Sequence, residues 1–147
     1  YIDGRELYVG VVGNQRLQAF PVWEMLFTRM PDHLAKIATA QVKFDPAYQK
    51  EHGILTRAAS DLAPAEQARI IRVCKRVYRA LSLSGYARLD LRLTPDGQIY
   101  VLEANPNPNL EYGEDFAESA ESIGIPYEGL LQRILSLGLR YRAAWRT

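Results

Sequence analysis

The alternation of apolar and polar positions in the first part of the chain predicts strands. β-Rich runs at 5–13, 18–27 and 36–44 predict three strands, of which the first two form a hairpin. Pro21 lies inside the second run, which places it at a sheet edge or a bulge because proline donates no ladder hydrogen bond. The polar stretch 46–60 predicts a loop with one helical turn.

The remainder of the chain predicts one long helix, a hairpin and two further helices. The segments that carry these patterns are 64–83, 86–94, 98–104, 114–123 and 126–142. Pro64 suits the first position of the long helix, and Thr94-Pro95-Asp96-Gly97 is typical of a type I turn between the two strands. Because strands and helices mix without strict alternation, we predict an α+β fold on a mainly antiparallel sheet.

Composition narrows the class of protein. With 147 residues, 48% hydrophobic and 24% charged, the chain predicts one globular domain and excludes disorder. A net charge of +1 is too small to attract the whole chain to nucleic acid or to an anionic membrane. No apolar run reaches the roughly 20 residues of a membrane span. The single cysteine, Cys74, excludes an internal disulfide and favours a reducing compartment, so we expect a cytoplasmic protein.

The predicted hairpin gathers charged side chains on one face. Four cross-strand pairs follow from a four-residue turn: Leu93 with Gln98, Leu91 with Tyr100, Leu89 with Leu102, and Arg88 with Glu103. Asp90 is then a diagonal neighbour of Glu103, and Asn105 shares their face if the strand continues. Oxygen-only ligands favour Mg²⁺ or Mn²⁺, and an arginine beside them can stabilise a transferring phosphoryl group. The alternative is a cross-strand salt bridge between Arg88 and Glu103.

These residues also carry a family resemblance. Gly-Tyr-Ala-Arg88-Leu-Asp90 and Leu102-Glu103-Ala-Asn105-Pro resemble the carboxy-terminal part of the ATP-grasp fold, and within it the D-alanine–D-alanine ligases. Ile2-Asp-Gly-Arg-Glu6-Leu-Tyr-Val looks like the strand after the adenine hinge, and Ala40-Gln-Val-Lys43-Phe44 looks like the phosphate-contacting strand. The resemblance covers nearly the whole chain.

The resemblance implies a role for each matched residue. Asp90, Glu103 and Asn105 would bind two Mg²⁺ ions, and Arg88 would hold the transferred phosphate. Three further residues would contact ATP: Lys43 at the terminal phosphates, Glu6 at the ribose and Leu102 in the adenine pocket. Simple alternation puts Leu102 on the face opposite Glu103, so this last role requires a bulge or a strong twist.

The implied activity is that of an ATP- and Mg²⁺-dependent ligase. A small-molecule carboxylate would be activated as an acyl phosphate and attacked by an amine, which forms an amide or peptide bond. We expect residues 1–147, which open on Tyr1, to be the carboxy-terminal part of an ATP-grasp domain that lacks its amino-terminal part and is inactive alone. We expect no nucleic-acid or membrane partner, and the sequence leaves homo-oligomerisation open.

Three departures from the family pattern bear on the substrate. Asn109 stands where the family has a glycine near the reacting centre, and Phe44 stands where the D-alanine enzymes often have tyrosine. Glu111, Glu114 and Asp115 occupy the stretch where those enzymes hold a substrate carboxylate with a hydroxyl, and acids there should repel it.

Two alternatives to a ligase stay open. The loop at 107–110, which departs from the family pattern at Asn109, supports a non-catalytic nucleotide- or metal-binding module with the same fold. A weaker alternative is a nucleic-acid binder that uses the basic side of the helix at 64–83.

Overall fold

The chain folds around one antiparallel sheet. The computed structural model describes residues 1–31 and 33–142. The strands of the sheet are β1 (Arg5–Val12), β2 (Gln18–Ala19), β3 (Trp23–Phe27), β4 (Ile54–Ala58), β5 (Tyr86–Leu93) and β6 (Ile99–Asn105). Their order is β4-β3-β1-β5-β6, with β2 paired to β1, and every pairing is antiparallel. The expected α+β fold on a mainly antiparallel sheet is confirmed.

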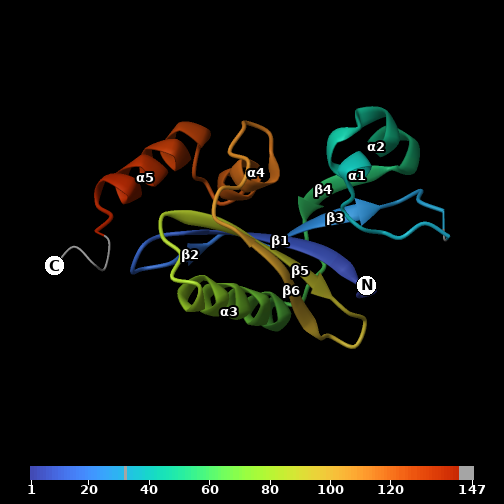
Figure 1. Ribbon diagram of the computed structural model, residues 1–147, viewed down its shortest axis with the longest axis horizontal. Helices are drawn as coiled ribbons and strands as arrows, with labels where there is room; N and C mark the ends of the chain where they lie inside the picture. Colours follow the sequence, from blue (N-terminus) through green and yellow to red (C-terminus); the bar gives the residue numbers. More distant parts are fainter. Residues whose placement is uncertain (32, 143–147) are drawn as a thin grey trace.

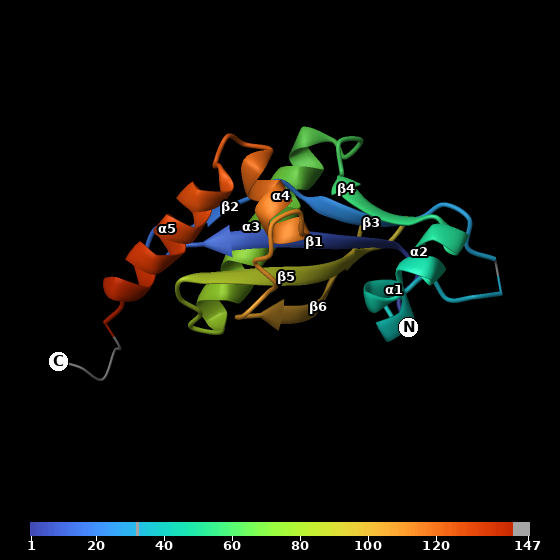
Figure 2. The ribbon, with the colours of Figure 1, turned by 90° about the horizontal axis from the view of Figure 1, so that it is seen from above.

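Helices cover both faces of this sheet. They are α1 (Ala40–Phe44), α2 (Pro46–His52), α3 (Pro64–Ala80), α4 (Asp115–Glu121) and α5 (Tyr127–Leu139). The long α3 lies alone beneath the sheet, while α1, α2, α4 and α5 lie on the other side (Figure 1). Seen from above, α1 and α2 lie near the end of the sheet at the N-terminus, and α5 lies near the other end (Figure 2).

The main core lies between α3 and the central strands. Leu7, Val9 and Val11 alternate along β1 toward this face and are fully buried, because β-strand side chains point to opposite faces in turn. Cys74 and Tyr78 face them from α3, whose apolar positions recur at helical spacing. The other face of β1 is therefore free to carry polar side chains.

The predicted strand at 36–44 is wrong, because residues 40–44 form the short helix α1. The Thr39 side chain caps it by accepting a hydrogen bond from the Val42 amide at 3.3 Å. Val42 is fully buried while Lys43 and Phe44 are exposed, which is the one-sided burial of a helix. Lys43 therefore lies on a helix, where a strand was predicted.

The predicted loop at 46–60 is also largely wrong. It contains the helix α2, where the Asp45 carboxylate accepts hydrogen bonds from the Ala47 and Tyr48 amides, and the edge strand β4. All five residues of β4 pair with β3. The second predicted strand, at 18–27, is divided into β2 and β3 around Pro21, and both parts pair with β1 as the expected hairpin.

The β5–β6 hairpin forms, but its predicted register is wrong. The Gly97 amide bonds to the Thr94 carbonyl and Gly97 has a φ of +81°, so a left-handed residue follows the turn and adds one residue to the loop. Leu93 consequently pairs with Ile99. A second shift occurs between Asp90 and Leu91, beyond which Asp90 pairs with Glu103.

Candidate functional site

The face of the sheet away from α3 carries a polar row across its two central strands. Glu6 and Tyr8 of β1 alternate with residues that face α3, and Arg88, Asp90 and Arg92 do the same on β5. The two strands are hydrogen-bonded neighbours in which Tyr8 pairs with Asp90 and Glu6 pairs with Arg92. This pairing places two carboxylates and two guanidinium groups on one surface.

The irregular register of the hairpin adds two residues of β6 to this surface. Asp90 and Glu103 are direct cross-strand partners, closer neighbours than the predicted diagonal pair. The register shift leaves Leu102 without a partner on β5, and Leu102 and Glu103 line the same cavity. The bulge that the predicted role of Leu102 requires is therefore present, and Leu102 is 51% exposed.

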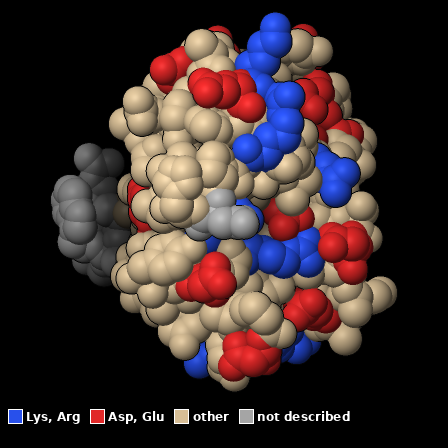
Figure 3. Space-filling view, turned by 90° about the vertical axis from the view of Figure 1, so that its right-hand side faces the viewer, with Lys and Arg blue, Asp and Glu red and all other residues tan. Residues whose placement is uncertain are grey.

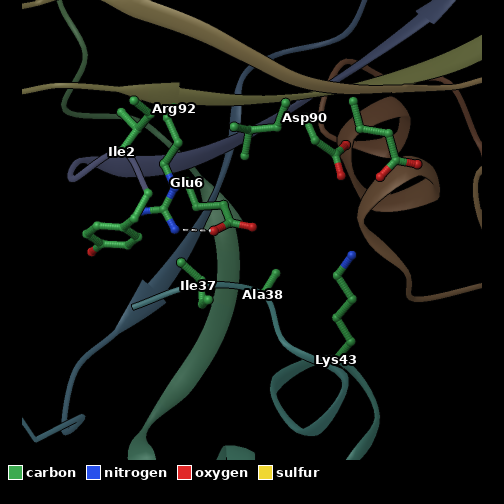
Figure 4. A pocket seen from close by; sticks show the side chains of 10 residues that line it. Ile2, Glu6, Ile37, Ala38, Lys43, Asp90 and Arg92 are labelled. Atoms are coloured by element: carbon green, nitrogen blue, oxygen red, sulfur yellow. Dashed lines mark hydrogen bonds and ion pairs between the residues drawn. The ribbon is translucent and has the colours of Figure 1, made fainter. Parts of the chain in front are cut away.

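A cavity of about 470 Å³ opens on this surface and contains most of the predicted residues. Its lining residues are Tyr1, Ile2, Glu6, Ile37, Ala38, Lys43, Asp90, Arg92, Leu102 and Glu103. Lys43 points from α1 across the cavity toward the sheet, which carries Asp90 (Figure 4). The sequence prediction for Glu6, Lys43, Asp90, Leu102 and Glu103 thus selects residues that lie together.

Glu6 is held rigidly at one end of this cavity. Its Oε2 accepts a hydrogen bond from Nη2 of Arg92 at 2.7 Å, and its Oε1 accepts one from the Tyr8 hydroxyl at 3.1 Å. Arg92 also donates to the Gly4 carbonyl at 2.7 Å. The Glu6–Arg92 pair appears as the dashed contact in Figure 4. A buried carboxylate with this many partners is fixed in position before any ligand arrives.

Arg88 forms a bidentate ion pair with Asp90. Nε and Nη2 of Arg88 donate to the two carboxylate oxygens at 2.8 Å each. The Arg88 guanidinium carbon lies 4.7 Å from the centroid of the Tyr8 ring, a cation–π contact. Burial opposes the charged form of Arg88, but the hydrogen bonds and charge of Asp90 outweigh it and raise the pKa of Arg88. Arg88 thus stays a cation.

A second cavity, of about 420 Å³, adjoins the first at Lys43. Its lining includes Arg88, Asn105, Lys43, Asn109 and Asp115, together with apolar side chains of α1 and β4. Lys43 lines both cavities, and the ion pair with Asp90 links Arg88 to the first. The predicted residues therefore divide between two adjoining cavities.

The oxygen donors of the site fit a hard divalent cation. Asp90 and Glu103 face each other across the ladder, and Asn105 follows two residues after Glu103 on β6. The Asn105 side-chain oxygen accepts a hydrogen bond from the Asn107 amide at 2.8 Å. Among residues 1–31 and 33–142, no group of three His, Cys, Asp or Glu could hold a metal by itself. The carboxylate pair and an amide match Mg²⁺, which commonly keeps water and substrate oxygens as its remaining ligands.

Two residues of the site, Tyr8 and Arg92, are not among those predicted from the sequence. A tyrosine in a strand is typical of packing, yet the Tyr8 hydroxyl donates a hydrogen bond to Glu6 and its ring contacts Arg88. Desolvation, followed by the charge of Glu6, raises the pKa of Tyr8 strongly, so the hydroxyl keeps its proton. Arg92 carries no sequence signal except its place in the alternation of β5. The shared period of two along β1 and β5 is the signal that could have identified both.

One face of the molecule carries charges of both signs. On the face in Figure 3, Lys and Arg side chains lie among Asp and Glu side chains. In the part of the chain that the structure describes, no helix is long and apolar enough to cross a membrane.

Comparisons with known proteins agree with the resemblance. The chain is 34% identical over 140 residues to the "Uncharacterized protein y4sG" of Sinorhizobium fredii, covering 95% of this chain and 40% of that protein. It is 31% identical over 144 residues to a D-alanine–D-alanine ligase of Desulfotalea psychrophila, covering 95% and 40%. The chain thus spans about two-fifths of the length of these relatives.

Solved structures share the fold. A crystal structure of the D-alanine–D-alanine ligase from Bacillus anthracis aligns with a TM-score of 0.72 at 25% identity, covering 95% of this chain and 41% of that one. The D-Ala:D-Ser ligase VanG from Enterococcus faecalis aligns with a TM-score of 0.69 at 20% identity over 93% of this chain and 37% of that chain. A family model described as "D-ala D-ala ligase C-terminus" matches residues 1–136, so the chain belongs to the family of the D-alanine–D-alanine ligase carboxy-terminal region.

Proposed function

We propose that this chain supplies the metal-binding and phosphate-binding part of an ATP-dependent ligase that joins a carboxylate to an amine. It would do so with a further part of the protein, since the curated relatives are about two and a half times as long, with 40% of their length covered. The observation that carries the proposal is the pairing of Asp90 with Glu103 in the first cavity, next to Arg88, which pairs with Asp90 and lines the second cavity.

The first cavity suits a nucleotide. Leu102 offers an apolar surface for a base, and Glu6 offers carboxylate oxygens that accept hydrogen bonds from ribose hydroxyls. Lys43 points across the cavity toward the carboxylates, where an ammonium group would neutralise terminal phosphates (Figure 4). An ATP complex is recorded for the D-alanine–D-alanine ligase of Bacillus anthracis, which this chain matches at 24% identity.

Asp90, Glu103 and Asn105 would hold the magnesium ions at the boundary between the cavities. When bound, Mg²⁺ would neutralise charge on the phosphate oxygens during transfer. Asp90 then has two cationic partners available, the metal and Arg88. The Arg88 ion pair fixes the Asp90 carboxylate before metal binding. The Asp90 side chain therefore loses little conformational freedom when the metal binds.

Arg88 would stabilise the acyl phosphate. The second cavity would admit the carboxylate substrate next to Arg88, where the carboxylate receives the phosphoryl group of ATP. The Arg88 guanidinium lies against the Tyr8 ring, and it presents hydrogen-bond donors to the negative charge that develops during transfer. Attack of the neutral amine on the acyl carbon forms the C–N bond and breaks the C–O bond to phosphate. The departing phosphate accepts the proton that the nitrogen loses.

The nucleotide and metal part of the proposal can be tested on this chain. Titration with Mn²⁺ and ATP, followed by paramagnetic relaxation, should show binding that Asp90→Asn and Glu103→Gln each weaken at least tenfold. Glu128→Gln, an exposed residue on α5, is the matched control and should bind as the parent chain does. Binding that survives both substitutions would contradict the metal assignment.

Turnover requires the longer protein. We expect ATP-dependent phosphate release when a carboxylate and an amine are both supplied, and no turnover from residues 1–147 alone. Asp90→Asn should abolish this release. Nucleotide binding without turnover, over a broad panel of acids and amines, would instead support the non-catalytic module. The altered loop at 107–110 favours this alternative.

A further inference from the structure

Tyr8 contacts one proposed functional residue in each half of the site. It belongs to the polar row on β1, and its side chain is buried, with only 2% of the residue exposed. The Tyr8 hydroxyl donates to Oε1 of Glu6 at 3.1 Å, and the Tyr8 ring centroid lies 4.7 Å from the guanidinium carbon of Arg88. Glu6 lines the first cavity, whereas Tyr8 and Arg88 both line the second. One buried side chain therefore touches the residue proposed for the ribose and the residue proposed for the transferred phosphate.

The hydroxyl of Tyr8 completes the set of donors that hold Glu6. The sulfur of Met25 lies 3.7 Å from the hydroxyl oxygen, but the carboxylate is the stronger acceptor, so the single hydroxyl proton goes to Glu6. Burial raises the pKa of Tyr8 strongly, which keeps this proton in place. With Arg92 bonded to Oε2 and Tyr8 bonded to Oε1, both oxygens of Glu6 are fixed, and their remaining lone pairs are available to ribose hydroxyls.

The ring of Tyr8 supports Arg88. Asp90 accepts hydrogen bonds from Nε and Nη2 of Arg88, which leaves the Nη1 donors for a ligand. Both partners of this ion pair lie on β5, so the pair alone lets the two side chains move together. The ring gives the guanidinium group a flat surface and ties it to a second strand, β1. A smaller side chain at this position would leave space into which the guanidinium could turn.

We infer that Tyr8 is a positioning residue with two separable roles: its hydroxyl orients Glu6 for the nucleotide ribose, and its ring holds Arg88 where it meets the transferred phosphoryl group. This inference rests on the proposed ligase function and adds to it a physical link between nucleotide binding and phosphoryl transfer. Phenylalanine at this position keeps the ring and loses the hydroxyl, whereas leucine loses both, so each role can be tested separately.

The role of the hydroxyl is tested with ATP and dideoxy-ATP, which lacks both ribose hydroxyls. Each is titrated with Mg²⁺ into the 147-residue chain by isothermal titration calorimetry. We expect the parent chain to bind ATP about tenfold more tightly than dideoxy-ATP. In Tyr8→Phe this ratio should fall at least threefold, while the affinity for dideoxy-ATP stays within about twofold of that of the parent chain. A general loss of stability would lower both affinities together and leave the ratio unchanged.

Tyr78→Phe is the matched control for this substitution. Tyr78 is also buried, with 1% exposed, and its hydroxyl also donates a hydrogen bond, to the Gly13 carbonyl at 2.8 Å. It lies on α3, which covers the other face of the sheet (Figure 1). Tyr78→Phe should therefore keep the ratio of the parent chain. An unchanged or larger ratio in Tyr8→Phe, or no preference for ATP in the parent chain, would overturn the role of the hydroxyl.

The role of the ring is tested without nucleotide. The Nε–Hε signal of Arg88 in ¹H–¹⁵N spectra, identified by its loss in Arg88→Lys, should show a ring-current shift and slow exchange with water in the parent chain and in Tyr8→Phe. In Tyr8→Leu the shift should disappear and the exchange should become at least tenfold faster. An unchanged signal in Tyr8→Leu would overturn the role of the ring. If Tyr8→Leu does not fold, as judged by circular dichroism, Tyr8→Met replaces it. Because this measurement needs neither ATP nor a metal ion, its failure is distinct from failure of the Mn²⁺ and ATP titration that tests the proposed function.

Discussion

Arg92 and Glu6 form an ion pair across the β1–β5 ladder, with 2.7 Å between Nη2 of Arg92 and Oε2 of Glu6. Their side chains are only 3% and 5% exposed, so the pair lies almost entirely out of water. Arg92 also donates to the carbonyls of Gly4 and Lys36, which ties the start of the chain and the segment before α1 to β5. The pair thus fixes one end of the first cavity.

Arg92→Met should destabilise the fold strongly. It would leave the Glu6 carboxylate buried without its cation. Such a change typically lowers the free energy of unfolding by roughly 3–5 kcal/mol. Urea denaturation followed by circular dichroism measures this. Arg79→Met, an exposed substitution of the same type on α3, should stay within about 0.5 kcal/mol of the parent chain. The double variant Glu6→Met/Arg92→Met should recover part of the loss, and no recovery would contradict the ion-pair explanation.

Leu102→Ala should weaken nucleotide binding and leave the stability of the fold nearly unchanged. Leu102 is 51% exposed in the bulge of β6, so the substitution should change the unfolding free energy by no more than about 0.5 kcal/mol. Its side chain lines the first cavity, and its loss should weaken ATP binding by about tenfold, or about 1.4 kcal/mol. Isothermal titration calorimetry provides the measurement. Val101→Ala, on the same strand but outside the cavity lining, should leave ATP affinity unchanged.

The sequence indicates which residues of the hairpin share a face more reliably than it indicates the pairing. Alternation alone places Arg88 and Asp90 together, and that holds in the structure. The register depends on Gly97, whose positive φ inserts a residue after the turn, and on the irregularity opposite Asp90. Neither is encoded in the apolar pattern, because apolar side chains pair with one another in the predicted register as well.

The prediction of the short helices and of the edge strand failed for a different reason. Residues 36–44 contain β-branched and aromatic residues that predict a strand, but the caps at Thr39 and Asp45 decide in favour of two short helices. The edge strand β4 is exposed at three of its five positions, so it lacks the alternation that predicts a half-buried strand. The contacts of Tyr8 and Arg92 depend on the pairing of β1 with β5, about 80 residues apart in sequence, which local patterns do not specify.

Cys74 should be inert to alkylation while the chain is folded. The side chain is fully buried on α3, and burial raises the pKa of the thiol to about 12. At pH 8 the reactive thiolate is then about 10⁻⁴ of the total, and the reagent has no access to it. Iodoacetamide labelling followed by mass spectrometry should be at least a thousandfold slower than in urea. The control Cys74→Ala/Ala80→Cys carries an exposed thiol on the same helix and should label rapidly; comparable slow labelling of both would contradict burial as the cause.

Asp115→Asn should stabilise the fold at neutral pH and not at acid pH. Burial is the largest influence on this carboxyl group and raises its pKa in the folded chain. A raised carboxyl pKa contributes stability that is present below the unfolded-state pKa and is lost as the pH rises through the folded-state pKa. The uncharged amide avoids this loss, so its advantage in unfolding free energy should grow from near pH 4 upward. Glu118→Gln should show no comparable trend. Thermal or urea unfolding between pH 3.5 and 7.5 measures the difference, and an advantage that shrinks with rising pH would show that Asp115 is stabilised, not strained, by its surroundings.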